Sequence, residues 1–234
     1  MTGRIHSIQT MGAVDGPGLR GVVFMQGCPL RCAYCHNPDT WTFEGGQEVT
    51  AEELCGKLLR YRSYYKNGGV TVSGGEPLMQ GEFVAELFRL LQSEGIHTAL
   101  DTSGIAPIEA ARCVLPFTNL VLCDLKFTSD TLYRKYTGMP MQPVLDFLDE
   151  IEAAKVPFWV RHVVVPGMTD SDEEVASIFR ICQRYQMFEK LELLPFKKIC
   201  ISKYQSMNLP FPLDATPECS PQRIQELYQM LNLD

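Results

Sequence analysis

Short apolar runs alternate along the chain with longer segments in which apolar residues recur every three or four positions. The short runs predict buried strands, and the longer segments predict amphipathic helices. This alternation is typical of a parallel sheet whose strands are connected by crossover helices. The predicted strands are residues 19–25, 70–73, 97–101, 120–124, 159–165 and 191–195.

Residues that start or stop helices support the helical segments. Thr50 and Glu53 form a capping box, which predicts a helix from residue 51. Gly95 ends a helix over 80–94, because glycine favours the left-handed position after a helix. Three more helices are predicted: one contains residues 144–151, one follows Ser171, and one begins at Pro221. Residues 196–220 are expected to form a loop.

Six predicted strands are fewer than the eight of a closed (β/α) barrel. We therefore expect an α/β fold with an open, partial barrel, in one domain over residues 1–234 that ends in a loop and helix from about residue 196. In such folds the active site lies at the carboxyl ends of the strands. Polar and glycine residues do gather after the predicted strands, which places a candidate site there.

Composition narrows the classes of partner. The net charge of −7 argues against a nucleic-acid partner, whose phosphates require a basic face. No apolar run reaches the length of a membrane span, so a membrane partner is not expected. Nine cysteines are an odd number, and the first residues do not have the pattern of a signal peptide. We expect a reduced, cytoplasmic protein.

Three cysteines, Cys28, Cys32 and Cys35, occur within eight residues with the spacing C-x-x-x-C-x-x-C. A four-iron four-sulfur cluster normally takes four thiolates, so three leave one iron free for a substrate or cofactor. The adjacent His36 leaves a second interpretation open, a zinc site with three cysteines and one histidine. In that case the site would be structural.

Charged residues end the neighbouring strands. Asp101, Asp124 and Lys126 follow two of them, and Arg161 lies in the next. They suit a zwitterionic, ribose-bearing ligand, and they equally suit a structural ion-pair network. Glu76, after two glycines, has apolar neighbours and needs a partner, for which a ligand ammonium group would serve.

The cysteine motif and the Gly74-Gly75-Glu76-Pro77 motif resemble those of the radical S-adenosylmethionine superfamily. The segments 12–20 (GAVDGPGLR), 34–37 (YCHN), 164–167 (VVPG) and 192–195 (ELLP) extend the resemblance to the enzymes that activate glycyl radical enzymes. It implies a partial (β/α)6, TIM-like barrel. It also implies reductive cleavage of S-adenosylmethionine, followed by abstraction of hydrogen from a backbone glycine of a partner enzyme.

The resemblance also implies roles for individual residues. Cys28, Cys32 and Cys35 would hold the four-iron four-sulfur cluster, Asp101, Thr102 and Asp124 would hold a monovalent cation, and Asp15 would meet the substrate peptide. The implied contacts to S-adenosylmethionine are Tyr34, Cys35, His36, Gly74, Gly75, Glu76, Asp124, Leu125, Lys126, Arg161 and Lys197.

Two details refine the implied partner and site. The family's usual Pro-Tyr-His reads Pro195-Phe196-Lys197, so a lysine replaces a histidine that contacts the cofactor. Between Cys35 and Gly74 there is only Cys55, not the cysteine-rich insertion of related activators, which favours pyruvate formate-lyase as the partner. Flavodoxin or ferredoxin would be the electron donor.

Other functions remain open from the sequence. One is a radical S-adenosylmethionine enzyme that activates a different glycyl radical enzyme or acts on a small molecule. Another is an iron–sulfur or zinc protein that carries electrons or has a structural role.

Overall fold

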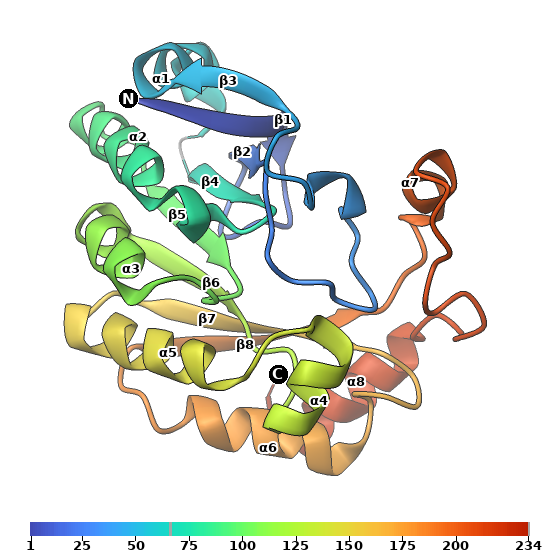
Figure 1. Cartoon of the computed structure of the whole chain (residues 1–234). Coiled ribbons are helices and arrows are strands. Elements are labelled where there is room, and N and C mark those ends of the chain that lie inside the picture. Colours follow the sequence, from blue (N-terminus) through green and yellow to red (C-terminus); the bar gives the residue numbers. More distant parts are fainter. Residues whose placement is uncertain (66, 234) are drawn as a thin grey trace.

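The computed structural model describes residues 1–65 and 67–233, which contain one open eight-stranded sheet (Figure 1). Its order is β3-β1-β2-β4-β5-β6-β7-β8. Strands β2 and β4 to β8 are parallel, whereas β1 pairs antiparallel with β2 and β3. Six parallel strands in an open sheet confirm the expected partial (β/α)6 barrel. The bounds are β1 Thr2–Gly12, β2 Arg20–Met25, β3 Gln47–Thr50, β4 Gly69–Gly74, β5 Thr98–Thr102, β6 Leu120–Asp124, β7 Phe158–Val164 and β8 Phe188–Pro195.

All six predicted strands are confirmed, but β1 and β3 were not predicted. Both belong to the antiparallel edge of the sheet, where one face is largely exposed. Their sequences are rich in polar residues, so they lack the continuous apolar run of a buried parallel strand. Sequence reasoning found the strands that contain a short apolar run and missed the two polar strands of the antiparallel edge.

Helices connect the parallel strands. The capping box of Thr50 and Glu53 is formed, and Gly95 has a left-handed φ of 71°. The helices are α1 Ala51–Leu59, α2 Gly81–Ser93, α3 Ile108–Val114, α4 Asp130–Thr137, α5 Gln142–Ala154, α6 Asp172–Cys182, α7 Ile201–Ser206 and α8 Pro221–Met230. Single 3₁₀ turns occur at Pro38–Thr40, Arg62–Tyr64, Pro77–Gln80 and Leu115–Phe117.

The predicted helices α1, α2, α5, α6 and α8 are confirmed. The expectation of a loop over 196–220 is wrong in part, because α7 lies within it. With six residues, α7 is too short to show a helical period. Helices α3 and α4, of seven and eight residues, were missed for the same reason.

The two faces of the sheet have different roles. Figure 1 shows α2, α3 and α5 along one side of the sheet. The large apolar core lies between the helices and this outer face, and it includes Val121, Cys123 and Val160. On the inner face a smaller cluster fills only the amino-terminal part of the sheet: Ala99, Leu120, Leu122 and Trp159. The carboxyl-terminal part of the inner face is therefore left for polar residues. Among the residues described, none of the helices has both the length and the apolar character needed to cross a membrane.

Candidate active site

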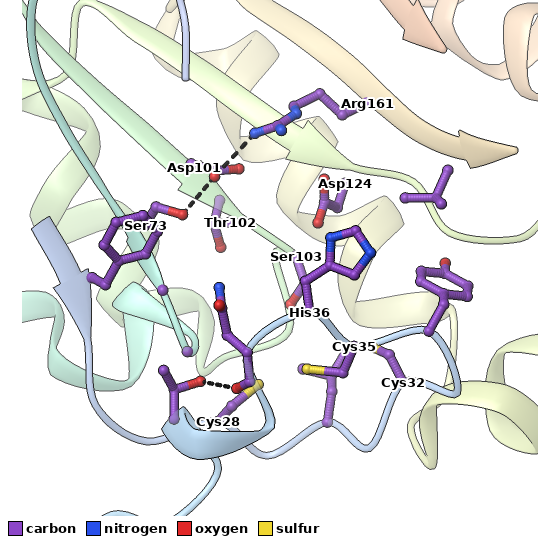
Figure 2. A pocket seen from close by; sticks show the side chains of 18 of the residues that line it. Cys28, Cys32, Cys35, His36, Ser73, Asp101, Thr102, Ser103, Asp124 and Arg161 are labelled. Carbon is purple, nitrogen blue, oxygen red and sulfur yellow. Dashed lines mark hydrogen bonds and ion pairs between the residues drawn. The ribbon is translucent and has the colours of Figure 1, made fainter. Parts of the chain in front are cut away.

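A cavity of about 390 Å³ lies at the carboxyl ends of the strands, between the loop after β2 and the inner face of the sheet. One side of it is formed by Cys28, Cys32 and Cys35, which we call the cysteine wall. The other side is formed by Asp101, Asp124, Lys126 and Arg161, which we call the charged wall. Figure 2 shows the cysteines facing Asp101, Asp124 and Arg161, with His36 between the two groups in this view.

The backbone of the cysteine loop is held from several sides. Gly27, with a φ of 97°, turns the chain out of β2, and its carbonyl accepts a hydrogen bond from the Glu76 amide at 2.8 Å. The amide of Arg31 donates to Thr137 O at the end of α4, at 2.8 Å. The Arg31 guanidinium donates to the Cys28 and Leu30 carbonyls at 2.8 and 2.7 Å. These contacts fix the loop that presents the three thiols.

The thiols of the cysteine wall are free, as are all nine cysteines. Burial raises the pKa of Cys28 to about 12 and that of Cys32 to about 11, and it also raises the pKa of Cys35. The thiols are therefore protonated in the metal-free protein. Binding of a metal centre here must release protons, because the thiolate is the ligand.

The arrangement of these thiols fits an iron–sulfur cluster. In the described parts of the chain, no three His, Cys, Asp or Glu side chains gather closely enough around one point to hold a single metal ion. Three thiols from one loop face one cavity, and three thiolates leave one iron of a four-iron cluster without a protein ligand. His36, the fourth ligand of the zinc alternative, donates from Nε2 to the Lys197 carbonyl at 2.9 Å. Burial lowers the pKa of His36, so its ring is neutral.

The charged wall consists of two ion pairs from neighbouring strands. Arg161 Nη1 lies 3.0 Å from Asp101 Oδ2, and Ser73 Oγ donates to the same oxygen at 2.6 Å. Lys126 Nζ lies 2.8 Å from Asp124 Oδ2. The register of the sheet places Asp124 opposite Arg161, so the two pairs are adjacent. Four charges are thus held at the cavity with no net charge.

The surroundings shift the pKa values of this wall in different directions. Burial raises the pKa of Asp101 above its ordinary value, although Arg161 opposes the change. Burial alone would also raise the pKa of Asp124, but Lys126 and Arg161 outweigh it and the pKa lies below its ordinary value. The Asp124 carboxylate in turn raises the pKa of Lys126 against the effect of burial. Asp124 and Lys126 therefore remain charged at neutral pH.

Two buried polar groups on the cavity lining have no protein partner among the described residues. They are the Tyr34 hydroxyl and Arg161 Nε. Burial also raises the pKa of Tyr34, so it keeps its proton and can donate. Buried polar groups are rarely left unpaired, and a polar ligand in the cavity would satisfy both.

Most of the predicted site residues do lie together. Besides the two walls, the predicted residues Asp15, Tyr34, His36, Gly74, Gly75 and Thr102 line the cavity. Val14 and Ile199 also line it and are both 76% exposed, so they mark its mouth.

Glu76 is not brought onto the cavity lining. Its side chain is 1% exposed, and its carboxylate accepts hydrogen bonds from Thr102 Oγ1 at 2.5 Å, from Ser103 Oγ at 2.6 Å, and from the amides of Ser103 and Leu78 at 2.9 and 3.1 Å. These four donors supply the partner that we expected a ligand to supply. A contact between the Glu76 side chain and a ligand stays a prediction.

Leu125 and Lys197 do not line the cavity either. Leu125 is fully buried. The Lys197 side chain points to Glu218, with Nζ 3.3 Å from Oε2, and only its carbonyl meets a cavity residue, His36. A contact between either residue and a ligand stays a prediction.

Sequence reasoning missed Ser73 and Ser103, which pair with Asp101 and Glu76. Both serines could have been predicted as site residues, because each lies at the carboxyl end of a predicted strand, beside a residue that was selected. A serine in such a place is usually assigned to a turn, and no local signal marks it as the partner of a buried carboxylate.

Comparison with known proteins assigns the family. The model of the Radical SAM superfamily matches residues 22–178. The pyruvate formate-lyase-activating enzyme of Clostridium pasteurianum is 49% identical over 213 residues, which are 90% of this chain and 89% of the relative. That of Staphylococcus epidermidis is 37% identical over 243 residues, which cover 100% and 97%. A solved radical SAM methyltransferase from Sphaerobacter thermophilus has the same fold, with a TM-score of 0.67 at 19% identity, over 91% of this chain and 63% of that one. This chain therefore belongs to the radical S-adenosylmethionine superfamily, whose enzymes use a four-iron four-sulfur cluster and S-adenosylmethionine.

Proposed function

We propose that this protein activates pyruvate formate-lyase by removing a hydrogen atom from a backbone glycine of that enzyme. The observation that carries the proposal is the cavity itself, in which three thiols from one loop face two ion pairs from the strand ends. The names of the relatives that match nearly the full chain support the choice of partner. The chain would act as one radical S-adenosylmethionine domain over residues 1–234.

The cysteine wall would hold the cluster through Cys28, Cys32 and Cys35. Three ligands would leave one iron free to bind the amino and carboxylate groups of S-adenosylmethionine. When bound, the cluster and S-adenosylmethionine supply one-electron cleavage of a carbon–sulfur bond and a carbon-centred radical that takes the glycine hydrogen. The protein contributes position and exclusion of water, because such a radical reacts with any nearby C–H bond.

The charged wall would bind the rest of S-adenosylmethionine. Lys126 and Arg161 would offer cations to the carboxylate oxygen that does not bind iron, and Asp101 and Asp124 would accept hydrogen bonds from the ribose hydroxyl groups and the amino N–H groups. Tyr34 and His36 would contact the adenosyl part, while Gly74 and Gly75 would offer backbone groups that no Cβ obstructs. We also propose a monovalent cation at Asp101, Thr102 and Asp124, and contacts of Glu76, Leu125 and Lys197 with S-adenosylmethionine.

The mouth of the cavity would receive the partner. Asp15 lines the cavity, and its carbonyl accepts a hydrogen bond from Thr71 Oγ1 at 2.6 Å, which fixes the loop between β1 and β2. With the exposed Val14 and Ile199, this loop would meet the glycine-bearing segment. Flavodoxin or ferredoxin would supply the electron, and nine free thiols suit a reducing cytoplasm.

The test is radical formation with purified components. The protein is reconstituted anoxically with iron and sulfide, reduced with dithionite, and mixed with S-adenosylmethionine and pyruvate formate-lyase. We expect 5′-deoxyadenosine and the electron paramagnetic resonance doublet of a glycyl radical. A pyruvate formate-lyase whose glycine is replaced by alanine is the control. Cleavage without a doublet would overturn the choice of partner, and no cleavage by protein with a full cluster would overturn the activity.

A further inference from the structure

His162 is a buried histidine behind the charged wall. It follows Arg161 on β7, and its side chain has no exposed surface. Because successive strand residues point to opposite faces, Arg161 faces the cavity and His162 faces the helices. His162 does not line the cavity and has no part in the function proposed above.

The ring of His162 is tied to the turn after β6. Nδ1 lies 2.8 Å from the Leu125 carbonyl, and Nε2 lies 3.4 Å from the Thr169 carbonyl. The shorter contact assigns the proton to Nδ1, which donates to Leu125. The Leu125 amide donates to the Arg161 carbonyl at 3.1 Å. Both backbone groups of Leu125 are thus held by two consecutive residues of β7.

The rest of this turn is held from two helices. The amide of Lys126 donates to the Tyr133 hydroxyl of α4 at 2.9 Å. The Thr128 amide and hydroxyl donate to the Glu174 carboxylate of α6 at 2.9 and 2.6 Å. The side-chain partners His162, Tyr133 and Glu174 do not line the cavity. On the cavity side, the same turn presents the Asp124–Lys126 pair.

We propose that His162 is a positioning residue for the binding of S-adenosylmethionine. Its Nδ1–H holds the Leu125 carbonyl, and thereby keeps Asp124 and Lys126 directed into the cavity. Without this donor, the buried Leu125 carbonyl is left unpaired and the turn shifts to find another partner. The inference rests on the proposed function, because it assigns Asp124 and Lys126 to S-adenosylmethionine.

A matched pair of variants tests the position of the donor. In His162→Asn the side-chain amide lies near the place of Nδ1, whereas in His162→Gln it reaches the place of Nε2. We expect His162→Asn to bind S-adenosylmethionine within about threefold of the parent, and His162→Gln to bind about tenfold more weakly, which is about 1.4 kcal/mol. Iron content per chain stays the same in both. Equilibrium dialysis of the reconstituted proteins gives the affinity without relying on turnover.

A buried residue outside the turn provides the control. Cys182→Ala, at a fully buried position of α6, lowers stability without touching the turn, and its affinity for S-adenosylmethionine stays at the parent value. Equal affinities of His162→Asn and His162→Gln, whether high or low, overturn the positioning role. If Lys126→Ala also leaves the affinity unchanged, the failure belongs to the proposed function of the charged wall.

Discussion

The cysteine wall comes from eight consecutive residues, whereas the charged wall is assembled from three neighbouring strands and the turn after β6. The metal-free cysteine wall is neutral, because burial raises the pKa of its thiols. The charged wall already carries its charges, which neutralise one another in pairs. The thiols of the cysteine wall thus become charged only when they bind a metal centre. The side chains of the charged wall are charged in the folded protein without one.

This difference indicates that cluster assembly and the binding of S-adenosylmethionine can be separated. Removing a thiol should prevent cluster assembly, and with it every later step. Removing a charge from the other wall should weaken the binding of S-adenosylmethionine while the cluster still assembles.

The largest effect is expected for Cys32→Ala. Two remaining thiols cannot hold the cluster as three do, so we expect iron content to fall and cleavage of S-adenosylmethionine to be abolished. Iron analysis and chromatography of 5′-deoxyadenosine measure the two results. Cys55→Ala, a buried cysteine of α1, is the control and should retain both. Cleavage at the parent rate by Cys32→Ala would refute the ligand assignment.

The second prediction concerns thiol reactivity in the metal-free protein. At pH 9 a cysteine in an unfolded chain is about half ionised, whereas a pKa of about 11 for Cys32 leaves roughly 50-fold less thiolate and a pKa of about 12 for Cys28 leaves roughly 500-fold less. We expect iodoacetamide to modify these two residues at least about 50-fold more slowly in the folded protein than in urea, as followed by peptide mass spectrometry.

The same pKa shifts have a consequence for stability. The folded state keeps protons that the unfolded chain loses above pH 9, so the metal-free protein should lose stability as the pH rises from about 9 towards 11. Asp124 acts in the opposite range: its lowered pKa stabilises the fold above about pH 4, and this contribution is lost as the pH falls below that. For the thiol-reactivity prediction, an equal rate of iodoacetamide modification of Cys28 in the folded and unfolded chains would contradict the contrast between the two walls.

The contrast between the two walls also explains how much of the fold and of the site could be predicted from the sequence. The six parallel strands contain short apolar runs that were visible in the sequence, although the outer strand β8 is partly exposed. The rule that sites lie at carboxyl strand ends brought Asp101, Asp124 and Arg161 to one place. The cysteine wall is a contiguous motif, so it could be recognised in the sequence without knowledge of the fold. Both walls were therefore within reach of the sequence.

The pairing within the charged wall was not predictable. Which acid meets which base is decided by register and by side-chain direction, neither of which is local: Asp101 pairs with Arg161, and Asp124 pairs with Lys126. Glu76 shows the same limit, because the two hydroxyls that turn it away from the cavity come from the next strand and its turn. Sequence gives the residues near a site more readily than their orientation.

Lys126→Ala is expected to have an intermediate effect. The substitution removes a cation from the cavity and leaves Asp124 without its ion-pair partner, so we expect the affinity for S-adenosylmethionine to fall about 30-fold, or about 2 kcal/mol. Iron content should not change. Equilibrium dialysis and iron analysis give both values, and Lys190→Ala, whose lysine is half exposed and pairs with Glu192, is the control. Loss of iron in Lys126→Ala would show that the two walls depend on one another.

The smallest effect is expected for Lys197→Ala, which tests whether a side chain from the segment after β8 contributes to either wall. The Lys197 ammonium forms an exposed ion pair with Glu218, and such pairs contribute about 0–1 kcal/mol. The contact of this residue with the site is the hydrogen bond from His36 to its carbonyl, which alanine retains. We therefore expect the affinity for S-adenosylmethionine to change less than about threefold. A loss of tenfold or more, with iron content unchanged, would mean that the Lys197 side chain leaves Glu218 and enters the cavity when the ligand binds. The charged wall would then extend beyond the sheet to the segment after β8.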